Sequence, residues 1–122
     1  MSDPSYDIHL DEKYGSMTLI DLDVEAAAHE PWFNQTLTKV NDTVIRLGVL
    51  EGEFHWHKHD LEDEFFLVLD GELILELEHA ETIHVHPHQG YTILRGTMHK
   101  TSAPTRTVLI MVEPAAVVPT GD

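Results

Sequence analysis

Two histidines and one glutamate are spaced so that together they could bind a metal ion. His57 and His59 fall in residues 54–59, whose composition predicts a strand. Side chains of a strand alternate between its two faces, so both imidazoles are expected on one face. The apolar run at residues 65–69 predicts a return strand, and such a hairpin would bring Glu64 beside the histidines. This donor set suits a divalent first-row metal with open coordination positions.

The same spacing occurs in a known sequence motif. His57, His59, Glu64 and Gly71 follow the order HxH(x)4E(x)6G, which resembles the first motif of the cupin superfamily. The leading glycine of that motif has a counterpart one residue later, at Gly52. This resemblance is specific because it fixes four residue types at three separate spacings.

A second segment, residues 90–99, resembles the second cupin motif. Gly96 lies three residues before His99, as in the family, whereas Leu94 replaces the family's proline and Ala103 its asparagine. Residues 17–122 as a whole are similar to small single-domain cupins often described as mannose-6-phosphate-isomerase-like. The resemblance implies four metal ligands, namely His57, His59, Glu64 and His99.

The donor set does not select one metal. Neutral imidazole and carboxylate suit iron, manganese, nickel, cobalt or zinc. Four protein ligands on an octahedral ion would leave two positions for water or substrate. Around a tetrahedral zinc they would close the site and indicate a structural role. We therefore expect one divalent ion of unassigned identity.

Two residues are candidates for proton transfer. Glu64 would lie at the ion itself. His55 shares the alternation of His57 and His59, so it is expected to point into the same cavity, as a proton donor or acceptor or as a group that orients a ligand. A histidine that merely bonds a hydroxyl of the barrel wall is an equally supported interpretation.

Four further residues are candidates for the wall of a substrate pocket. Phe66, Ile93 and Met98 would give a mainly apolar surface around the polar centre. Arg46 could bind a carboxylate or phosphate if its face of the strand lines the cavity. The opposite face of that strand carries Ile45, Leu47 and Val49. This pattern slightly favours an outward-facing Arg46.

A third group of histidines also alternates. His84, His86 and His88 lie at a strand end that enters a proline–glycine turn, with no carboxylate at a matching spacing. A solvated sheet edge is the favoured interpretation of this group, ahead of a metal site.

The remaining pattern predicts short strands separated by turns, which is typical of a sandwich or barrel. A short helix is expected at residues 24–29, with Asp21 or Asp23 as its N-cap. Further strands are expected at residues 17–22, 32–39, 43–50, 72–78, 82–86, 91–94 and 105–112. Cupins are double-sheet jelly rolls, so the pattern and the resemblance both indicate an all-β double-stranded β-helix. We expect a loose arm at residues 1–16, one barrel domain at 17–112 and a tail at 113–122.

Composition narrows the classes of partner. The 122 residues include 22 acidic and 7 basic side chains, for a net charge of −15, and no cysteine. Such a charge disfavours nucleic acid and anionic membranes. With no visible signal peptide or membrane span, we expect a cytoplasmic protein. The apolar side chains of residues 65, 67 and 69 need covering, which predicts a homodimer.

Three functions remain open. The first is a metal-dependent enzyme, isomerase-like or dioxygenase-like, that acts on a small oxygenated substrate. The second is a module that binds a small molecule such as a sugar or effector without turnover. The third is a structural metal site in an assembly protein. Cupins include dioxygenases, isomerases, decarboxylases, lyases and non-catalytic sugar or effector binders, so the fold does not establish the function.

Overall fold

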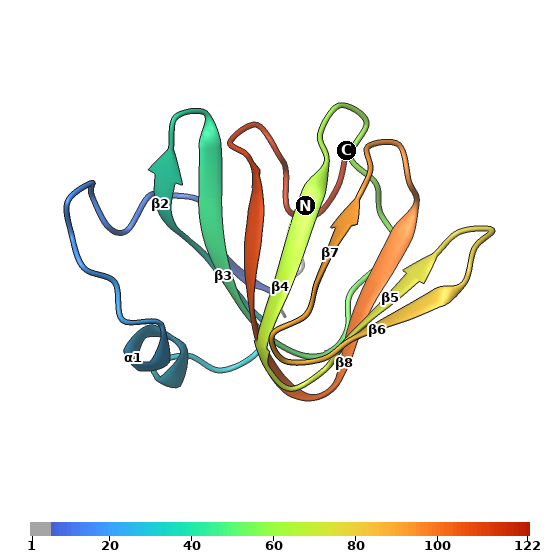
Figure 1. Cartoon of the computed structure of the whole chain (residues 1–122), viewed down its shortest axis with the longest axis horizontal. Helices are drawn as coiled ribbons and strands as arrows, with labels where there is room; N and C mark the ends of the chain where they lie inside the picture. The colour runs from blue at the N-terminus through green and yellow to red at the C-terminus, as the bar shows by residue number, and fades with distance from the viewer. Residues whose placement is uncertain (1–5) are drawn as a thin grey trace.

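The computed structural model describes residues 6–122 as a barrel of β-strands arranged around its longest strand, β8 (His99–Pro114) (Figure 1). The second half of β8 pairs with β3 (Thr43–Glu53) on one side and with β4 (Glu64–Asp70) on the other. The first half pairs with β5 (Leu73–Leu77). Because β8 pairs along its length with β3, β4 and β5, it joins these strands into a single barrel. The predicted all-β jelly-roll fold is confirmed.

Four shorter strands complete the barrel. β2 (Phe33–Val40) pairs with β3, and β1 (Asp7–His9) adds to β2 in parallel. β6 (Thr82–Val85) pairs with β5, and β7 (Gly90–Ile93) pairs with β4. Apart from the β1–β2 pair, all the strand pairs are antiparallel. None of the helices in residues 6–122 is long and apolar enough to cross a membrane.

Side-chain alternation along β8 divides the core into two apolar clusters. Leu109 and Met111 point into the barrel, whereas Val108 and Ile110 pack on the other side of the sheet. The interior cluster also contains Leu50, Phe66, Val68, Leu73, Leu75, Val85, Ile93 and Ala103. The outer cluster also contains Ala26, Phe33, Leu37, Leu47 and Val49. Both faces of the central sheet are therefore buried, which explains the nearly continuous apolar runs in β3 and β8.

The short helix α1 (Leu22–Ala27) helps to cover the outer cluster. Asp21 is its N-cap, as one of the two predicted alternatives, and accepts a hydrogen bond of 3.1 Å from the amide of Val24. Glu25 is buried in α1 and accepts hydrogen bonds from Lys13 Nζ (2.7 Å) and from the Tyr14 hydroxyl. These bonds attach the segment before α1 to the helix.

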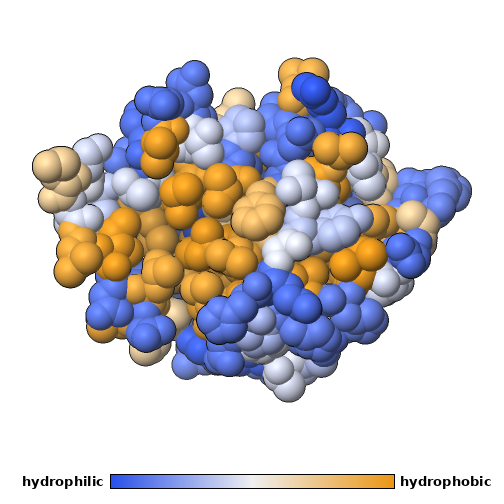
Figure 2. Space-filling view, viewed as in Figure 1, coloured by the Kyte–Doolittle hydropathy of each residue, from blue (hydrophilic) through white to orange (hydrophobic). Residues whose placement is uncertain are grey.

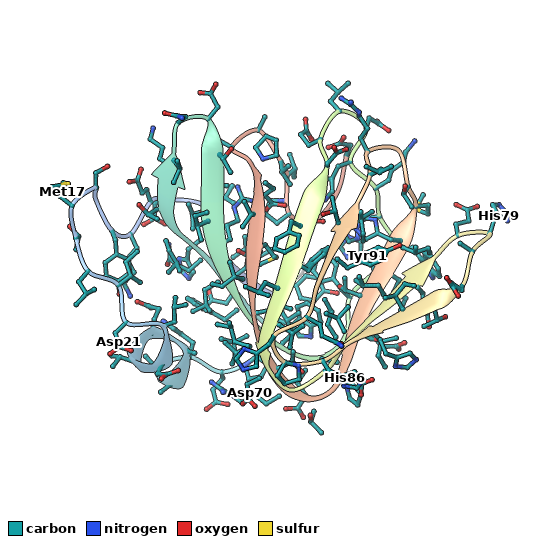
Figure 3. The ribbon with its side chains drawn as sticks, in the orientation of Figure 1. Met17, Asp21, Asp70, His79, His86 and Tyr91 are labelled. Atoms are coloured by element: carbon teal, nitrogen blue, oxygen red, sulfur yellow. The ribbon has the colours of Figure 1, made fainter. Side chains whose placement is uncertain are left out.

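The predictions for the N-terminal part are wrong in two places. The expected loose arm is docked, since β1 pairs with β2 and the amides of Lys13 and Tyr14 donate to carbonyls of β2. Residues 1–5 of that arm lie outside the described residues. No strand forms at residues 17–22, where Met17 has a positive φ of 63° and is fully exposed. The segment there turns towards α1 (Figure 3).

The hairpin predicted around the metal motif does not form either. β3 ends at Glu53, and residues 54–59 are irregular apart from a single bridge between His57 and His99. β4 pairs with β7 and β8 instead. A single bridge at His57 does not force the side chains of residues 54–59 to alternate between two faces. The prediction that every second side chain in this segment points the same way therefore does not hold throughout.

One face of the sheet remains only partly covered. Leu67, Leu69 and Val112 are half-buried next to the outer cluster. Figure 2 shows hydrophobic side chains gathered over β3, β8 and β4 on the side that faces the viewer. The homodimer expected from this surface stays a prediction.

The Glu25 contacts predict a pH-dependent contribution to stability. Burial alone would raise the pKa of Glu25, but the bonds from Lys13, Tyr14 and His29 lower it to about 2. The unfolded chain therefore binds a proton that the folded chain does not as the pH falls from 4.5 towards 2. Glu25→Gln should lower the free energy of unfolding by about 2–3 kcal/mol at pH 7. The difference from the native protein should shrink in that acidic range.

Urea denaturation at pH 7 and at pH 3 measures the loss in free energy of unfolding at neutral pH and its decrease in acid. Glu30→Gln, an exposed carboxylate just after α1, serves as the control and should be neutral at both pH values. An equal loss in Glu25→Gln at the two pH values would contradict the assignment.

Candidate metal centre

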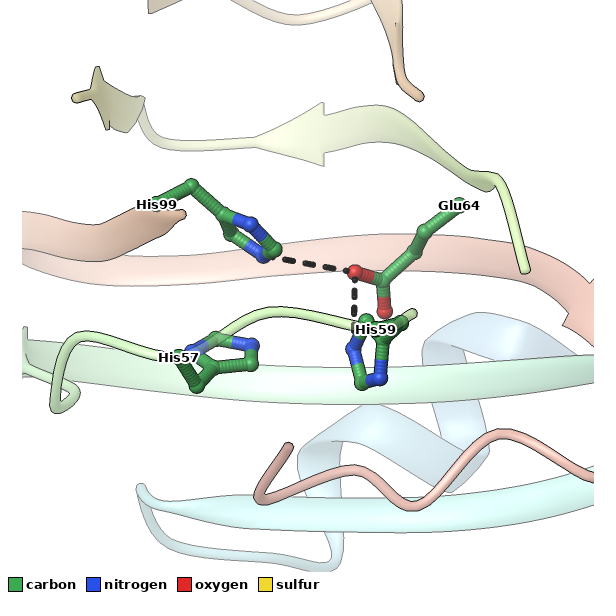
Figure 4. A group of neighbouring side chains, drawn as sticks. All are labelled: His57, His59, Glu64 and His99. Atoms are coloured by element: carbon green, nitrogen blue, oxygen red, sulfur yellow. Dashed lines mark ion pairs between the residues drawn. The ribbon is translucent and has the colours of Figure 1, made fainter. Parts of the chain in front are cut away.

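The four residues that the cupin resemblance implies as ligands come together in the structure (Figure 4). His57 and His59 lie in the irregular segment between β3 and β4, Glu64 begins β4 and His99 begins β8. His57 and His99 exchange two backbone hydrogen bonds, of 2.9 and 2.8 Å. This bridge, rather than a hairpin, brings the loop histidines to the first residue of β8.

The distances among these side chains suit a single ion. Glu64 Oε1 lies 3.6 Å from His59 Nε2 and 3.7 Å from His99 Nε2. One ligand atom from each of the four residues lies within 4.8 Å of the others, and all four residues are buried. Ligands about 2.1 Å from a metal are ~3 Å apart when adjacent and ~4 Å when opposite. Small shifts would therefore place all four around one ion.

Hydrogen bonds orient two of the imidazole rings. His57 Nδ1 lies 3.0 Å from the carbonyl of His55, and His99 Nδ1 lies 2.8 Å from the carbonyl of Thr97. A carbonyl accepts only from N–H, so the proton sits on Nδ1 and the Nε2 lone pair is free for a metal. Each ring is thus fixed by the chain two residues before it.

Unpartnered polar atoms gather at this centre. Six buried side-chain atoms have no hydrogen-bond partner within the described chain, and four belong to the cluster: both ring nitrogens of His59, Glu64 Oε1 and His99 Nε2. Burying such atoms without partners costs free energy that a bound cation would recover. The residues present therefore fit a metal ion.

The electrostatics of the cluster favour a neutral His57 beside a charged Glu64, whereas the Glu64 carboxylate raises the pKa of His59 against the effect of burial. Burial and the nearby His99 lower the pKa of His57 to about 4, so that ring is neutral near pH 7. Burial alone would raise the pKa of Glu64, but contacts with Glu113, His59 and His99 lower it well below its usual range. Both effects keep these groups in the protonation states that bind metal.

A buried ion pair lies behind Glu64. Arg46 donates to Glu113 Oε1 at 2.7 Å and to Thr36 Oγ1 at 3.1 Å, and both residues of the ion pair are almost fully buried. Burial and the adjacent Glu64 raise the pKa of Glu113 well above its usual range. Of the two neighbouring carboxyl groups, Glu64 is thus the one whose pKa is lowered, and Glu113 is the one that pairs with Arg46.

The C-terminal residues cover one side of the cluster. The Asp122 amide donates to the carbonyl of Lys58 at 2.9 Å, and Asp122 Oδ2 accepts from the Asp60 amide at 2.6 Å. A side chain at Gly121 would place its Cβ 2.6 Å from the Cβ of His57. Glu62 and Asp122 also offer carboxylate oxygens within 4.8 Å of a His59 nitrogen. Of the tail expected at residues 113–122, the first two residues belong to β8, and Gly121 and Asp122 lie against the cluster.

Two of the predicted site residues are placed differently. His55 is exposed, and its Nε2 lies 2.6 Å from the carbonyl of Thr120, so it does not point into the cavity with the ligands. Its parity argument fails because residues 54–56 are not a strand. Arg46 is 2% exposed, which corrects the outward orientation that the sequence slightly favoured. Its own donors are engaged by Glu113 and Thr36.

The apolar candidates are all inside or near the barrel. Phe66 lies in the wall of a cavity beside the cluster, together with His57 and Glu64. Ile93 is buried in the interior cluster, and Met98 is half-buried in the loop before β8. Sequence reasoning missed much of this wall, including Tyr6, Trp32, Asn34, Phe54 and Thr101. Their strands were predicted in part, but no motif connects them to the site.

The histidines at residues 84, 86 and 88 do not join the metal cluster. His84 is exposed and forms an ion pair of 2.7 Å with Glu72, a carboxylate that the sequence spacing did not reveal. His86 Nε2 lies 4.0 Å from the same Glu72 carboxylate, towards the lower end of the barrel in Figure 3. This arrangement agrees with a solvated edge.

Removing one ligand should empty the centre and leave the barrel folded. In His59→Ala we expect metal affinity to fall by at least about 100-fold, because a ligand contributes more than the outer contacts that orient it. Elemental analysis of protein purified without chelators, with circular dichroism to check the fold, measures this. His84→Ala is the matched control and should retain the native metal content. Full occupancy in His59→Ala would contradict the ligand assignment.

Comparisons with known proteins identify the family. The cupin-domain family model matches residues 44–113, more than half of the chain. The uncharacterized protein YdbB of Bacillus subtilis (strain 168) is 40% identical over 80 residues, which span 66% of this chain and 71% of that protein. A cupin-2 domain protein of Shewanella frigidimarina superposes with a TM-score of 0.74 at 28% identity, over 79% of this chain and 94% of that one.

A more distant solved structure shows the same fold. Protein NMB1881 of Neisseria meningitidis has a TM-score of 0.72 at 17% identity, over 80% of this chain and 99% of that one. The matched family region contains all four clustered ligand residues. Family match, relative and fold agree, and the chain belongs to the cupin superfamily.

Proposed function

We propose that this cupin is a metal-dependent enzyme that acts on a small oxygenated substrate. The observation that carries the proposal is the contact between the buried ligand cluster and a cavity, since His57 and Glu64 belong to both. A purely structural site would be expected to close around its ion on all sides. The divalent ion held by His57, His59, Glu64 and His99 would supply Lewis-acid or redox chemistry to a substrate in that cavity.

The side chains around the cavity bear on the class of reaction. An isomerase needs a base with a pKa near the working pH. Glu64 is a weak base because its pKa is held low, and His55 is bonded to the tail outside the cavity. These features favour a dioxygenase-like reaction over an isomerase-like one. Glu64 is therefore proposed as a ligand rather than as the catalytic base.

The decisive property is an open coordination position. Protein loaded with Mn²⁺ should show enhanced water-proton relaxation from at least one exchanging water on the ion. A bound ion without exchangeable water would support the structural interpretation and overturn the proposal.

Turnover separates an enzyme from a binding module. Protein loaded with iron, manganese or nickel should consume oxygen with small diketones or phenols, and His59→Ala should lose this activity together with its metal. Ligand binding without oxygen uptake or isomerisation would favour the non-catalytic alternative.

A further inference from the structure

We infer that the ligand of this site has an apolar, preferably aromatic body and a small metal-binding head, and is not a sugar phosphate. The inference rests on the proposed function, because it concerns the cavity beside the same metal centre. It adds the substrate class, which neither the ligand cluster nor the family fixes.

Aromatic rings form much of the cavity wall. Phe54 lies with its ring centroid 4.5 Å from that of Tyr6 and 5.1 Å from that of Trp32. Phe66 and Met111 contribute further apolar surface, and His57 and Glu64 belong to the same wall. Flat rings of this kind stack well on unsaturated or aromatic ligands. A sugar, whose surface carries many hydroxyl groups, would leave most of those groups without partners here.

One polar atom is available away from the ion. Asn34 belongs to the cavity wall, and its Oδ1 is buried without a hydrogen-bond partner among the described residues. Whichever way the amide is turned, one buried end of it lacks a partner. A single hydroxyl or N–H on an otherwise apolar ligand would satisfy that atom.

The cavity offers no cationic side chain for an anion. Within residues 6–122, its wall includes no lysine or arginine. Arg46 is the buried arginine behind the centre, and its guanidinium is already bonded to Glu113 and Thr36. Phosphate recognition in proteins depends on such groups. The net charge of −15 further opposes the approach of an anion.

The size of the cavity sets a limit on the ligand. Its volume is about 40 Å³, several times the ~10–15 Å³ that one water requires on the same scale. The space therefore admits a small head group, with the rest of the ligand against the aromatic wall. Pro119 of the C-terminal segment also belongs to this wall.

A matched pair of chelators tests the inference. Acetohydroxamic and benzohydroxamic acid carry the same metal-binding head and are both neutral in solution near pH 7, but only the second has an aromatic body. With Mn²⁺-loaded protein we expect benzohydroxamic acid to bind at least about 10-fold more tightly, as burial of a phenyl ring implies. Mannose 6-phosphate should not displace it.

The two tryptophans of the chain provide matched variants. Trp32 belongs to the cavity wall, whereas Trp56 is 46% exposed and lies outside it. Trp32→Leu should reduce the advantage of the aromatic chelator at least threefold, while Trp56→Leu should leave it unchanged. In Trp56→Leu the remaining Trp32 fluorescence should respond to benzohydroxamic acid, and in Trp32→Leu the remaining Trp56 should not. Metal content and circular dichroism verify that both variants are folded and loaded.

The outcomes separate the two proposals. If the protein binds Mn²⁺ and both hydroxamic acids equally, or if mannose 6-phosphate competes, the inferred ligand class is wrong and the open metal site stands. If the protein binds Mn²⁺ but neither chelator, the site is closed and the proposed function fails. An effect of Trp56→Leu equal to that of Trp32→Leu would also overturn the inference.

Discussion

The burial of polar side chains inside the barrel is the constraint on which the rest of this structure depends. Three histidines and a glutamate lie where water is largely excluded, and several of their atoms have no partner within the described chain. Each such atom costs about 1–3 kcal/mol. The apolar layers on both faces of the central sheet must compensate for this cost until an ion binds. A metal centre of this kind is therefore expected to bring its own stabilisation, as ligands that bind only the folded state do.

Charged side chains lie both at the centre and directly behind it. Glu64 carries negative charge next to the ligand nitrogens, while burial and the adjacent Glu64 raise the pKa of Glu113 behind it. Arg46 completes this chain from the far side, at 2.7 Å from Glu113. A buried arginine without a carboxylate would be very costly, so these residues are mutually dependent. Their interaction also explains why the nearest guanidinium is not available to a ligand.

The sequence predicted most of the strands and the clustering of His57, His59, Glu64 and His99 because both depend on local patterns. The apolar runs of β4 and β8, the alternation of β5 and the spacing around His57 each involve residues close together in the sequence. The docking of β1 could not be predicted, since it depends on pairing with β2, more than twenty residues away. The orientation of Arg46 was misjudged for a related reason. The apolar residues on the other face of β3 seemed sufficient to define the interior, but α1 and the preceding segment bury that face as well.

The aromatic wall illustrates a different limit. Tyr6, Trp32 and Phe54 come from three separate segments, and none of them stands at a motif position. Their convergence depends on how β1 and the irregular segment after β3 pack, which no single-chain pattern encodes. Sequence reasoning thus found the residues that cluster as candidate metal ligands and missed most of those that line the neighbouring cavity.

Asp122 contacts the segment that carries His57 and His59. How firmly the C-terminal residues are held should therefore depend on whether the metal centre is occupied. The amide of Asp122 is bonded to Lys58, between two ligand histidines, and Gly121 packs against His57. An ion that holds His57 and His59 in place also holds the Lys58 carbonyl between them, which accepts the hydrogen bond from the Asp122 amide. Hydrogen–deuterium exchange at the Asp122 amide should therefore slow as the centre fills, so one backbone position reports occupancy without a spectroscopic metal.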